Sequence, residues 1–429
     1  MGRRVAGQPA MTPKRCEFLV VGAGITGLTI ARELLARGAG DILVLDKEPA
    51  LGVHASGRNS GVLHAGIYYT PDSLKARFCA EGNRLMKEFC RSRGLTLAET
   101  GKVVVARDAS EIEQLAELKA RAGAAGARAE LIDAARLEQL EPHARTHEVA
   151  LHSPDTAVVK PREILDAVAR ELRESGRCRI ELGVRFVEAL APDVVQTSAG
   201  PVRFERLVNC AGAFADRIAH GFGLAREYRL IPFKGTYRKL VPARAHLVRG
   251  SVYPVPDLGN PFLGVHLTRG ADGDVYAGPT ALPAFGREAY RGLRGVGREA
   301  PVIAARDVLL LGRNRDFRRA ARSETRKYSG KVVYREAAAL VPELRPDDLQ
   351  RTEKVGIRPQ LVHWPTRRLV MDFVVVSDER GFHVLNAVSP AFTSSMAFAR
   401  EVAGSLLGQQ PDEGAGFHAR AAGEVSDRP

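Results

Sequence analysis

Residues 18–46, FLVVGAGITGLTIARELLARGAGDILVLD, decide the fold of this 429-residue chain. The apolar run 18–21 predicts a buried strand, and a glycine-rich turn over 22–27 follows it. The composition of 28–37 favours a helix, and the apolar run 42–45 predicts a second buried strand. The stretch is therefore a complete strand–helix–strand unit of the kind that builds parallel sheets.

The turn within this unit has the spacing G-x-G-x-x-G. Gly22 permits the tight turn, Gly24 lets a pyrophosphate approach the backbone, and Gly27 lets the helix pack closely on the strand. Asp46 ends the second strand 19 residues after Gly27, where an acid binds ribose hydroxyls. The unit predicts a site for an ADP-containing dinucleotide but does not separate NAD from FAD, because both carry ADP.

The rest of the chain predicts two domains. Strand and helix signals alternate again over 161–210, including a helix over 161–174, whereas 231–278 favours short strands broken by Pro and Gly. We expect an α/β protein in which a discontinuous Rossmann-like domain carries an inserted α+β domain of mostly antiparallel sheet. The expected Rossmann-like domain comprises 17–100, 150–228 and 351–410, and the inserted domain comprises 101–149 and 229–350, with flexible tails at 1–16 and 411–429. Finer expectations are two surface helices within 110–140, strands over 369–376 and 382–387, and a helix over 392–407.

Composition narrows the class of protein. Apolar residues make up 45% and charged residues 26%, which is typical of globular domains. Five widely spaced cysteines without a C-x-x-C pair indicate neither a disulfide framework nor a metal site, and favour a reducing, cytoplasmic location. The sequence contains no run of 18 apolar residues, so it predicts no membrane span.

The net charge of +13 is concentrated in one segment. Residues 287–335 contain 14 Lys or Arg and five Asp or Glu. This segment is either a solvated helical face or a surface that contacts anionic lipid. We expect no nucleic-acid partner, because no nucleic-acid-binding motif and few interleaved aromatic residues accompany the charge.

Four sequence blocks carry a family resemblance. In chain order they are NSGVLHAGIYYTPDSLKARFC (59–79), PFKGTYRKL (232–240), NPFLGVHLTR (260–269) and NAVSPAFTSS (386–395). Together with the glycine turn, this order resembles the D-amino-acid-oxidase-like superfamily of FAD-dependent oxidoreductases, and within it the L-2-hydroxyglutarate dehydrogenases and oxidases. The resemblance extends from about residue 18 to about residue 403.

The resemblance implies FAD as the cofactor. The small polar loop 56–61 resembles the segment that runs beside the pyrophosphate and the flavin ring, and Ala211-Gly212 resembles a second glycine-bearing turn that covers FAD. The segment 386–390 resembles one that directs the N-terminus of the last helix at the flavin, where a positive helix end stabilises anionic reduced flavin. The cofactor-binding residues expected on this basis are Gly22, Gly24, Gly27, Asp46, Lys47, Ser56, Asn59, Ser60, Gly61, Val184, Ala211, Gly212, Ser389, Pro390 and Thr393.

The reaction implied is oxidation of a small 2-hydroxy acid, L-2-hydroxyglutarate to 2-oxoglutarate. It requires a cation for the carboxylate, a base for the hydroxyl proton and a path for hydride to flavin N5. Arg358 matches the family's carboxylate clamp, His266 is the preferred base, and His64 is the competing base. Candidate partners for a second carboxylate are Tyr68, Lys234, Tyr237 and Tyr253.

Two positions depart from close members of the group. Arg58 replaces a histidine and Thr100 replaces a cysteine, which leaves FAD binding intact but leaves the substrate open. The alternatives are an FAD-dependent amine oxidase acting on glycine, sarcosine or a D-amino acid, and a flavin-binding scaffold without turnover. The electron acceptor is either oxygen or a membrane quinone, and a quinone suits peripheral contact with the inner face of a membrane through 287–335.

Overall fold

A computed structural model describes residues 12–257, 263–292, 294–409 and 420–421. Most of the predicted tails, 1–16 and 411–429, lies outside these residues. Two parts of the predicted tails are described, and both include strand residues: β1 (Lys14–Val21) begins at Lys14, and Arg420–Ala421 form β22. None of the described helices is long and apolar enough to cross a bilayer.

Parallel strands form the core of one sheet, here called the β1 sheet. β1 pairs in parallel with β2 (Ile42–Asp46) on one side and with β12 (Gly200–Asn209) on the other. In sheet order the strands are β22, β20 (Val374–Ser377), β21 (Gly381–Asn386), β12, β1, β2 and β9 (Cys178–Leu182), and the hairpin β10 (Phe186–Ala191) and β11 (Val194–Thr197) pairs with β12 through β11.

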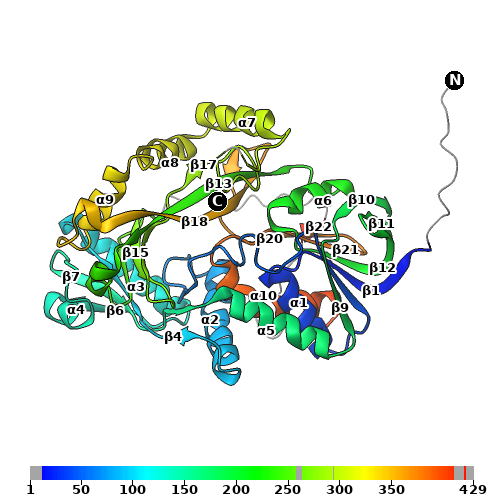
Figure 1. The fold of residues 1–429 in the computed structure, drawn as a ribbon, viewed down its shortest axis with the longest axis horizontal. Helices are drawn as coiled ribbons and strands as arrows, with labels where there is room; N and C mark the ends of the chain where they lie inside the picture. Colours follow the sequence, from blue (N-terminus) through cyan, green and yellow to red (C-terminus); the bar gives the residue numbers. More distant parts are fainter. Residues whose placement is uncertain (1–11, 258–262, 293, 410–419, 422–429) are drawn as a thin grey trace.

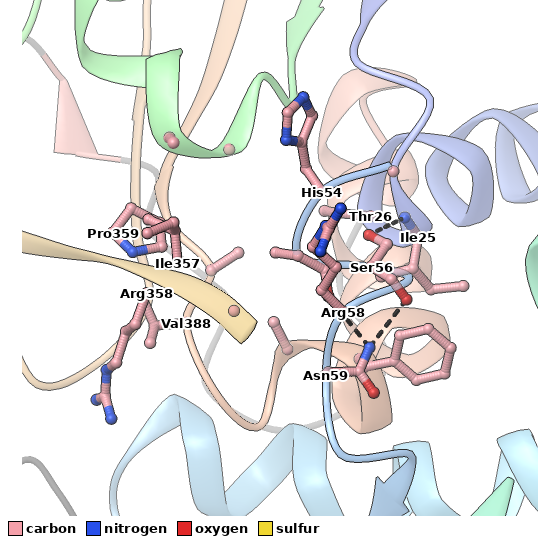
Figure 2. Close-up of a pocket in the computed structure, with 18 of the residues that line it drawn as sticks. Ile25, Thr26, His54, Ser56, Arg58, Asn59, Ile357, Arg358, Pro359 and Val388 are labelled. Atoms are coloured by element: carbon pink, nitrogen blue, oxygen red, sulfur yellow. Dashed lines mark hydrogen bonds between the residues drawn. The ribbon is translucent and has the colours of Figure 1, made fainter. Parts of the chain in front are cut away.

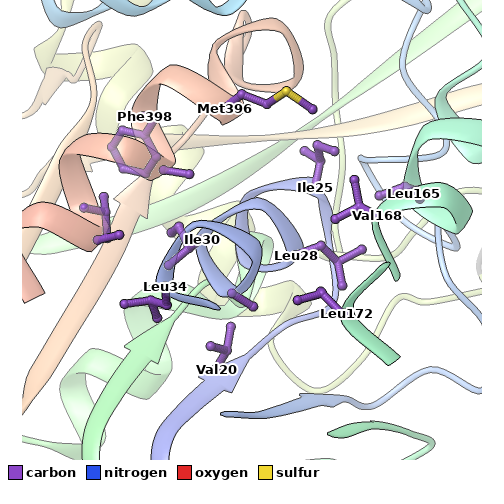
Figure 3. Packing of buried hydrophobic residues seen from close by; sticks show 14 of the residues in the cluster. Val20, Ile25, Leu28, Ile30, Leu34, Leu165, Val168, Leu172, Met396 and Phe398 are labelled. Atoms are coloured by element: carbon purple, nitrogen blue, oxygen red, sulfur yellow. The ribbon is translucent and has the colours of Figure 1, made fainter. Parts of the chain in front are cut away.

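Helices cover one face of the β1 sheet. They are α1 (Ile25–Ala36), α2 (Leu74–Ser92), α5 (Pro161–Glu174) and α10 (Ala391–Leu406). Side chains alternate along a strand, so Val20 faces these helices and packs with Leu28 and Phe398 in one buried cluster (Figure 3). Leu19 belongs instead to a second cluster that includes Ile218 of α6 (Ala215–Gly221) on the opposite face. The centre of this sheet is therefore buried on both sides, as expected for parallel strands.

A second sheet, here called the β13 sheet, is antiparallel except where β14 pairs with β5. In sheet order its strands are β19 (Arg368–Leu369), β18 (Leu349–His363), β13 (Tyr228–Leu240), β16 (Val275–Gly278), β15 (His266–Arg269), β14 (Ser251–Pro254), β5 (Lys102–Val105), β7 (Val149–Ser153) and β6 (Glu130–Asp133), with β17 (Leu282–Pro283) also paired to β13. A small third sheet joins β3 (Val62–Leu63), β8 (Ala157–Val159) and β4 (Leu97–Ala98). The expected fold class, an α/β unit with a mostly antiparallel companion, is confirmed.

The remaining helices surround the β13 sheet. Figure 1 shows α7, α8 and α9 along its outer edge, far from the N-terminal strand β1. The elements are α3 (Ile112–Ala124), α4 (Ala134–Leu140), α7 (Ala300–Arg313), α8 (Arg315–Arg326), α9 (Gly330–Ala338) and the short 3-10 turns η1 (Ala109–Glu111), η2 (Gly212–Phe214), η3 (Pro242–Leu247) and η4 (Pro346–Asp348). The ends of strands of the β1 sheet face the β13 sheet, and the site lies between them.

Several local expectations were wrong in detail. The first helix begins at Ile25 rather than at residue 28, and the Ile25 N–H at its start donates to Ser56 Oγ, 2.9 Å away. The two helices expected within 110–140 exist, but β6 lies between them because it pairs with β7. The segment 369–376 is not one strand: β19 and β20 belong to different sheets.

One expectation for the inserted region also needs correction. The segment 231–278 contains not only short strands, since β13 runs for 13 residues and pairs along most of its length with the 15-residue β18. Pro232 does not interrupt β13. It lies opposite Pro359 of β18, and two prolines can face each other only where neither backbone nitrogen has to donate a hydrogen bond to the other strand.

Candidate active site

A cavity of about 910 Å³ lies between the two main sheets. The ends of β1, β2, β12 and β21 line one side, and residues of β13, β14, β15 and β18 line the other. In Figure 2, Ile357, Arg358 and Pro359 of β18 stand across the cavity from the segment that carries Ser56 and Asn59. The cavity thus joins the predicted dinucleotide turn to the predicted substrate side chains.

The glycine turn is a backbone cradle. A Cβ on Gly22, whose φ is +113°, would lie 2.4 Å from the Cys210 carbonyl oxygen, and one on Gly27 would lie 2.0 Å from the Gly22 oxygen. Gly22 and Gly24 line the cavity, whereas Gly27 does not and instead allows the turn to pack on itself. The N-terminus of α1 therefore opens toward the cavity with only backbone and small groups in the way, as a pyrophosphate requires.

Asp46 holds the end of β2 against this turn. Its Oδ2 accepts the Ala23 N–H at 2.8 Å, and its Oδ1 accepts the Glu48 N–H at 2.9 Å. A carboxylate has about four lone-pair sites, so capacity for ribose hydroxyls remains. Lys47 also lines the cavity, and its amine bonds to Glu48 and Glu288.

The other predicted cofactor residues gather around the same cavity. Thr393 in the first turn of α10 accepts the His64 N–H at 3.1 Å, which fixes the loop that follows β3 against the N-terminus of this helix. Gly61 does not line the cavity, since it packs on the Val159 carbonyl. The predicted cofactor residues that line the cavity are Gly22, Gly24, Asp46, Lys47, Ser56, Asn59, Ser60, Val184, Ala211, Gly212, Ser389, Pro390 and Thr393.

His266 is held in one tautomer. Its Nδ1 lies 3.1 Å from the Gly264 carbonyl, an acceptor, so Nδ1 carries the proton and Nε2 keeps a lone pair. The ring stacks on Tyr253, with 3.8 Å between centroids and 14° between planes, and both residues line the cavity. Burial lowers the pKa of His266 to about 3, with a smaller contribution from the Lys102 charge. His266 is therefore a neutral acceptor at physiological pH.

His64, the competing base, also lines the cavity. Burial lowers its pKa to about 3 as well, and the charge of Lys102 adds to this effect. Its Nδ1 is buried without a hydrogen-bond partner among the described residues. The structure therefore fixes the ring of His266 more fully than that of His64.

Arg358 supplies a cation to the cavity. It lies on β18 opposite Phe233 of β13 and extends away from the His54 side in Figure 2. Burial lowers its pKa to about 10, so the guanidinium remains charged at neutral pH. Tyr237, from the adjacent strand, lines the same cavity.

Two predicted substrate residues do not line the cavity. Lys234 alternates along β13 with Phe233 and Gly235, which do line it. Tyr68 is buried one layer further back, with its ring 4.3 Å from the Lys102 amine. Only Tyr237 and Tyr253 of the four proposed partners for a second carboxylate therefore face the cavity.

Sequence reasoning missed two contributions. Glu288 and Tyr290 come from the loop after β17 and line the cavity beside His54. The Tyr290 ring stacks on the His54 ring, and the Arg58 guanidinium lies over the Tyr290 ring in a cation–π contact. The other is Lys102, a buried lysine at the start of the apolar strand β5. A single lysine before an apolar run, KVVV, was the available signal for it.

The residues present fit an FAD molecule. The glycine cradle leaves no room for side chains, an acid follows β2, and the N-termini of α1 and α10 both meet the cavity. Fold and site together define an FAD-dependent oxidoreductase. Residues 17–404 match the model of the DAO family, described as FAD dependent oxidoreductases, and the chain belongs to this family.

Within the family, the chain is similar to curated dehydrogenases over nearly its whole length. It is 35% identical to the mitochondrial L-2-hydroxyglutarate dehydrogenase of Bos taurus, covering 90% of this chain and 88% of that protein. It is 34% identical to L-2-hydroxyglutarate dehydrogenase of Escherichia coli (strain K12), covering 93% and 95%. The fold matches L-alpha-glycerophosphate oxidase from Mycoplasma pneumoniae with a TM-score of 0.73 at 19% identity, covering 96% of this chain and 100% of that one. The resemblance read from the sequence is confirmed, and FAD is the cofactor.

Proposed function

We propose that the protein oxidises L-2-hydroxyglutarate to 2-oxoglutarate. The observation that carries the proposal is that Arg358 and a tautomerically fixed His266 line one cavity with the glycine turn. Support for the substrate comes from the similarity to curated proteins of that name in animals and bacteria.

Arg358 binds the carboxylate next to the reacting carbon in this proposal. A guanidinium presents paired N–H donors that match the two oxygens of a carboxylate, which orients the α-carbon as well as attracting it. Burial makes this contact stronger than it would be in water, because the local dielectric is lower. The substrate is thereby held with its hydroxyl on the side of His266.

His266 accepts the hydroxyl proton at Nε2. As the O–H bond gives its proton to the imidazole, its electron pair forms the new C=O bond, and the α C–H bond breaks with its pair as hydride. Bound FAD supplies the two-electron acceptor for that hydride. A negatively charged substrate raises the pKa of His266 from its low value, which improves the histidine as a proton acceptor.

The first experiment is an anaerobic titration of the purified holoenzyme, followed by flavin absorbance. L-2-Hydroxyglutarate should bleach the flavin band, and the D enantiomer should not. A flavin that neither enantiomer bleaches would refute the proposed substrate. Substrate-dependent release of ammonia or methylamine from glycine, sarcosine or a D-amino acid would establish the amine oxidase instead.

We further propose that α7 and α8 dock on an anionic membrane, where a quinone accepts the electrons. On α7 the apolar side chains Val302, Val308 and Leu311 are exposed, Val308 to 68%. The exposed side chains of α8 include Arg315, Arg319, Arg322 and Arg326. An exposed apolar face beside a basic one is the pattern of helices that lie in a lipid interface.

Vesicle flotation tests this surface. The protein should float with phosphatidylglycerol vesicles at low salt and much less with phosphatidylcholine or at high salt. Changing Arg315, Arg319 and Arg322 to Glu should abolish flotation. The matched control changes Arg162, Arg170 and Arg173, exposed on α5, to Glu and should keep it. Equal loss in both variants, or no flotation of the natural protein, would contradict the proposal.

A further inference from the structure

Lys102 is a buried cation close to the candidate active site. Lys102 is only 2% exposed, and its amine has no hydrogen-bond partner among the described residues. The amine lies 4.3 Å from the ring centroid of Tyr68 and 5.0 Å from that of Tyr253. Aromatic faces attract a cation but do not replace the hydrogen bonds that an ammonium group loses on burial.

Further unpartnered donors share the face of the sheet on which Lys102 lies. Ser251 of β14 lies opposite Thr268 of β15, and continuing the register of β14 with β5 places Ser251 beside Lys102. Residues opposite one another on paired strands point to the same face. The Ser251 and Tyr68 hydroxyls are buried without a hydrogen-bond partner in the described part of the chain, and the buried Thr268 hydroxyl lies beside Tyr253. We call these four residues the Lys102 recess.

None of the four residues of the recess lines the cavity, but the recess lies next to two residues that do. Tyr253 and His266 are two residues along β14 and β15 from Ser251 and Thr268, so they share the same face and form the next row. The Tyr253 ring lies near both groups, with its centroid 5.0 Å from the Lys102 amine and 3.8 Å from the centroid of the His266 ring. Lys102 is also the charged group that acts most strongly on both His64 and His266.

The donor set matches a carboxylate. An ammonium and three hydroxyls can all donate, and none of the four described side chains contacts a carboxylate that would neutralise the lysine. We propose that the Lys102 recess binds the substrate carboxylate remote from Arg358, so that the enzyme selects dicarboxylic 2-hydroxy acids. This inference rests on the proposed function, in which Arg358 binds the carboxylate beside the reacting carbon.

Two features make Lys102 suited to this role. Its four-carbon side chain has rotatable bonds that can carry the amine past the edge of Tyr253 into the cavity. Burial lowers the pKa of Lys102 to about 7, and an arriving carboxylate opposes this effect and favours the charged amine. Neither Lys102 nor Lys234 lines the cavity, but the Lys102 amine lies 5.0 Å from the ring centroid of Tyr253, which does, so the proposal places Lys102 rather than Lys234 at the second carboxylate.

The test compares two non-oxidisable probes, glutarate and butyrate, by their perturbation of flavin absorbance in the holoenzyme. Natural protein should bind glutarate more tightly than butyrate. Lys102→Met should weaken glutarate binding by about 10- to 100-fold and change butyrate binding less than twofold. The matched control is Lys239→Met, a lysine of the same sheet that pairs with Asp274 and does not line the cavity. It should retain the preference for glutarate.

A second variant guards against loss of folding. Ser251→Ala removes one hydroxyl from the recess and should weaken glutarate binding by about 3- to 10-fold, again sparing butyrate. Equal weakening of both probes, or an unchanged preference for glutarate in both variants, would overturn the proposal. Because neither probe is oxidised, this result is independent of whether L-2-hydroxyglutarate bleaches the flavin, so the two proposals fail separately.

Discussion

Replacing Asp307 with Asn should stabilise the protein, and increasingly so as the pH rises. Asp307 lies on the inner side of α7 between Ile303 and Leu310, and it is only 8% exposed. Both carboxylate oxygens are buried without a donor among the described residues. Burial consequently raises the pKa of Asp307 from 3.8 to about 7.

The direction in which Asp307 changes stability with pH follows from proton binding by the folded and unfolded chains. Below about pH 4 the group is protonated in both the folded and the unfolded chain, so ionisation has no effect on stability. Between about pH 4 and pH 7 the unfolded chain releases its proton and the folded chain keeps it, so stability falls with rising pH. A tenfold change in the ionisation constant is about 1.4 kcal/mol, so the total cost above pH 7 is about 4 kcal/mol. About half of it, roughly 2 kcal/mol, is lost between pH 5.5 and pH 8.

Urea denaturation at pH 5.5 and at pH 8 measures this difference. The advantage of Asp307→Asn over the natural protein should grow by about 2 kcal/mol between the two conditions. Asp347→Asn, at an exposed position in η4, makes the same change of charge and should show no such growth. An advantage that is equal at both pH values, or absent at pH 8, would refute the reasoning.

Three further substitutions test the site. His266→Asn should lower the flavin reduction rate by about 10²- to 10⁴-fold while FAD stays bound, and a larger loss in His64→Asn under the same stopped-flow conditions would make His64 the base. Arg358→Met should weaken binding of glutarate and butyrate alike by about 10- to 100-fold, measured by flavin absorbance; unchanged binding would remove it from the carboxylate site. Gly27→Val should yield protein with little FAD, because its Cβ would lie 2.0 Å from a backbone oxygen of the turn. Gly123→Ala, with open space around it, is the control, and a normal ratio of flavin to protein in Gly27→Val would contradict the packing argument.

Local patterns made much of the fold predictable. The unit over 18–46 depends on contacts between neighbouring segments, and the helix over 161–174 was predicted with the bounds it has in the structure. The strand β6 was not predicted, because four residues between two helices carry too little periodicity and its stability comes from pairing with β7. The length of β13 was missed for the same reason, since β18 supports it from more than 100 residues away.

The candidate site shows the same division. Gly22, Gly24 and Asp46 could be assigned from spacing, because their roles depend on one turn and one strand end. Lys234 and Lys102 could not be ranked, because which of them lies near the cavity depends on the alternation along β13 and on the position of β5 in the sheet. The loop that carries Glu288 and Tyr290 has no sequence motif and reaches the cavity only through the tertiary fold.

The strand order of the β1 sheet also has a consequence for synthesis of the chain. Its neighbouring strands β1, β12 and β21 come from 14–21, 200–209 and 381–386, so the nucleotide turn emerges from the ribosome long before the sheet behind it is complete. Until then residues 207–209 of β12, which later pair with β21, have no partner on that side, and such an unpaired apolar segment is a template for aggregation. Such non-local pairing slows folding. Nascent chains should therefore depend on chaperones and acquire flavin only after translation has nearly ended, and truncation before residue 381 should yield insoluble protein.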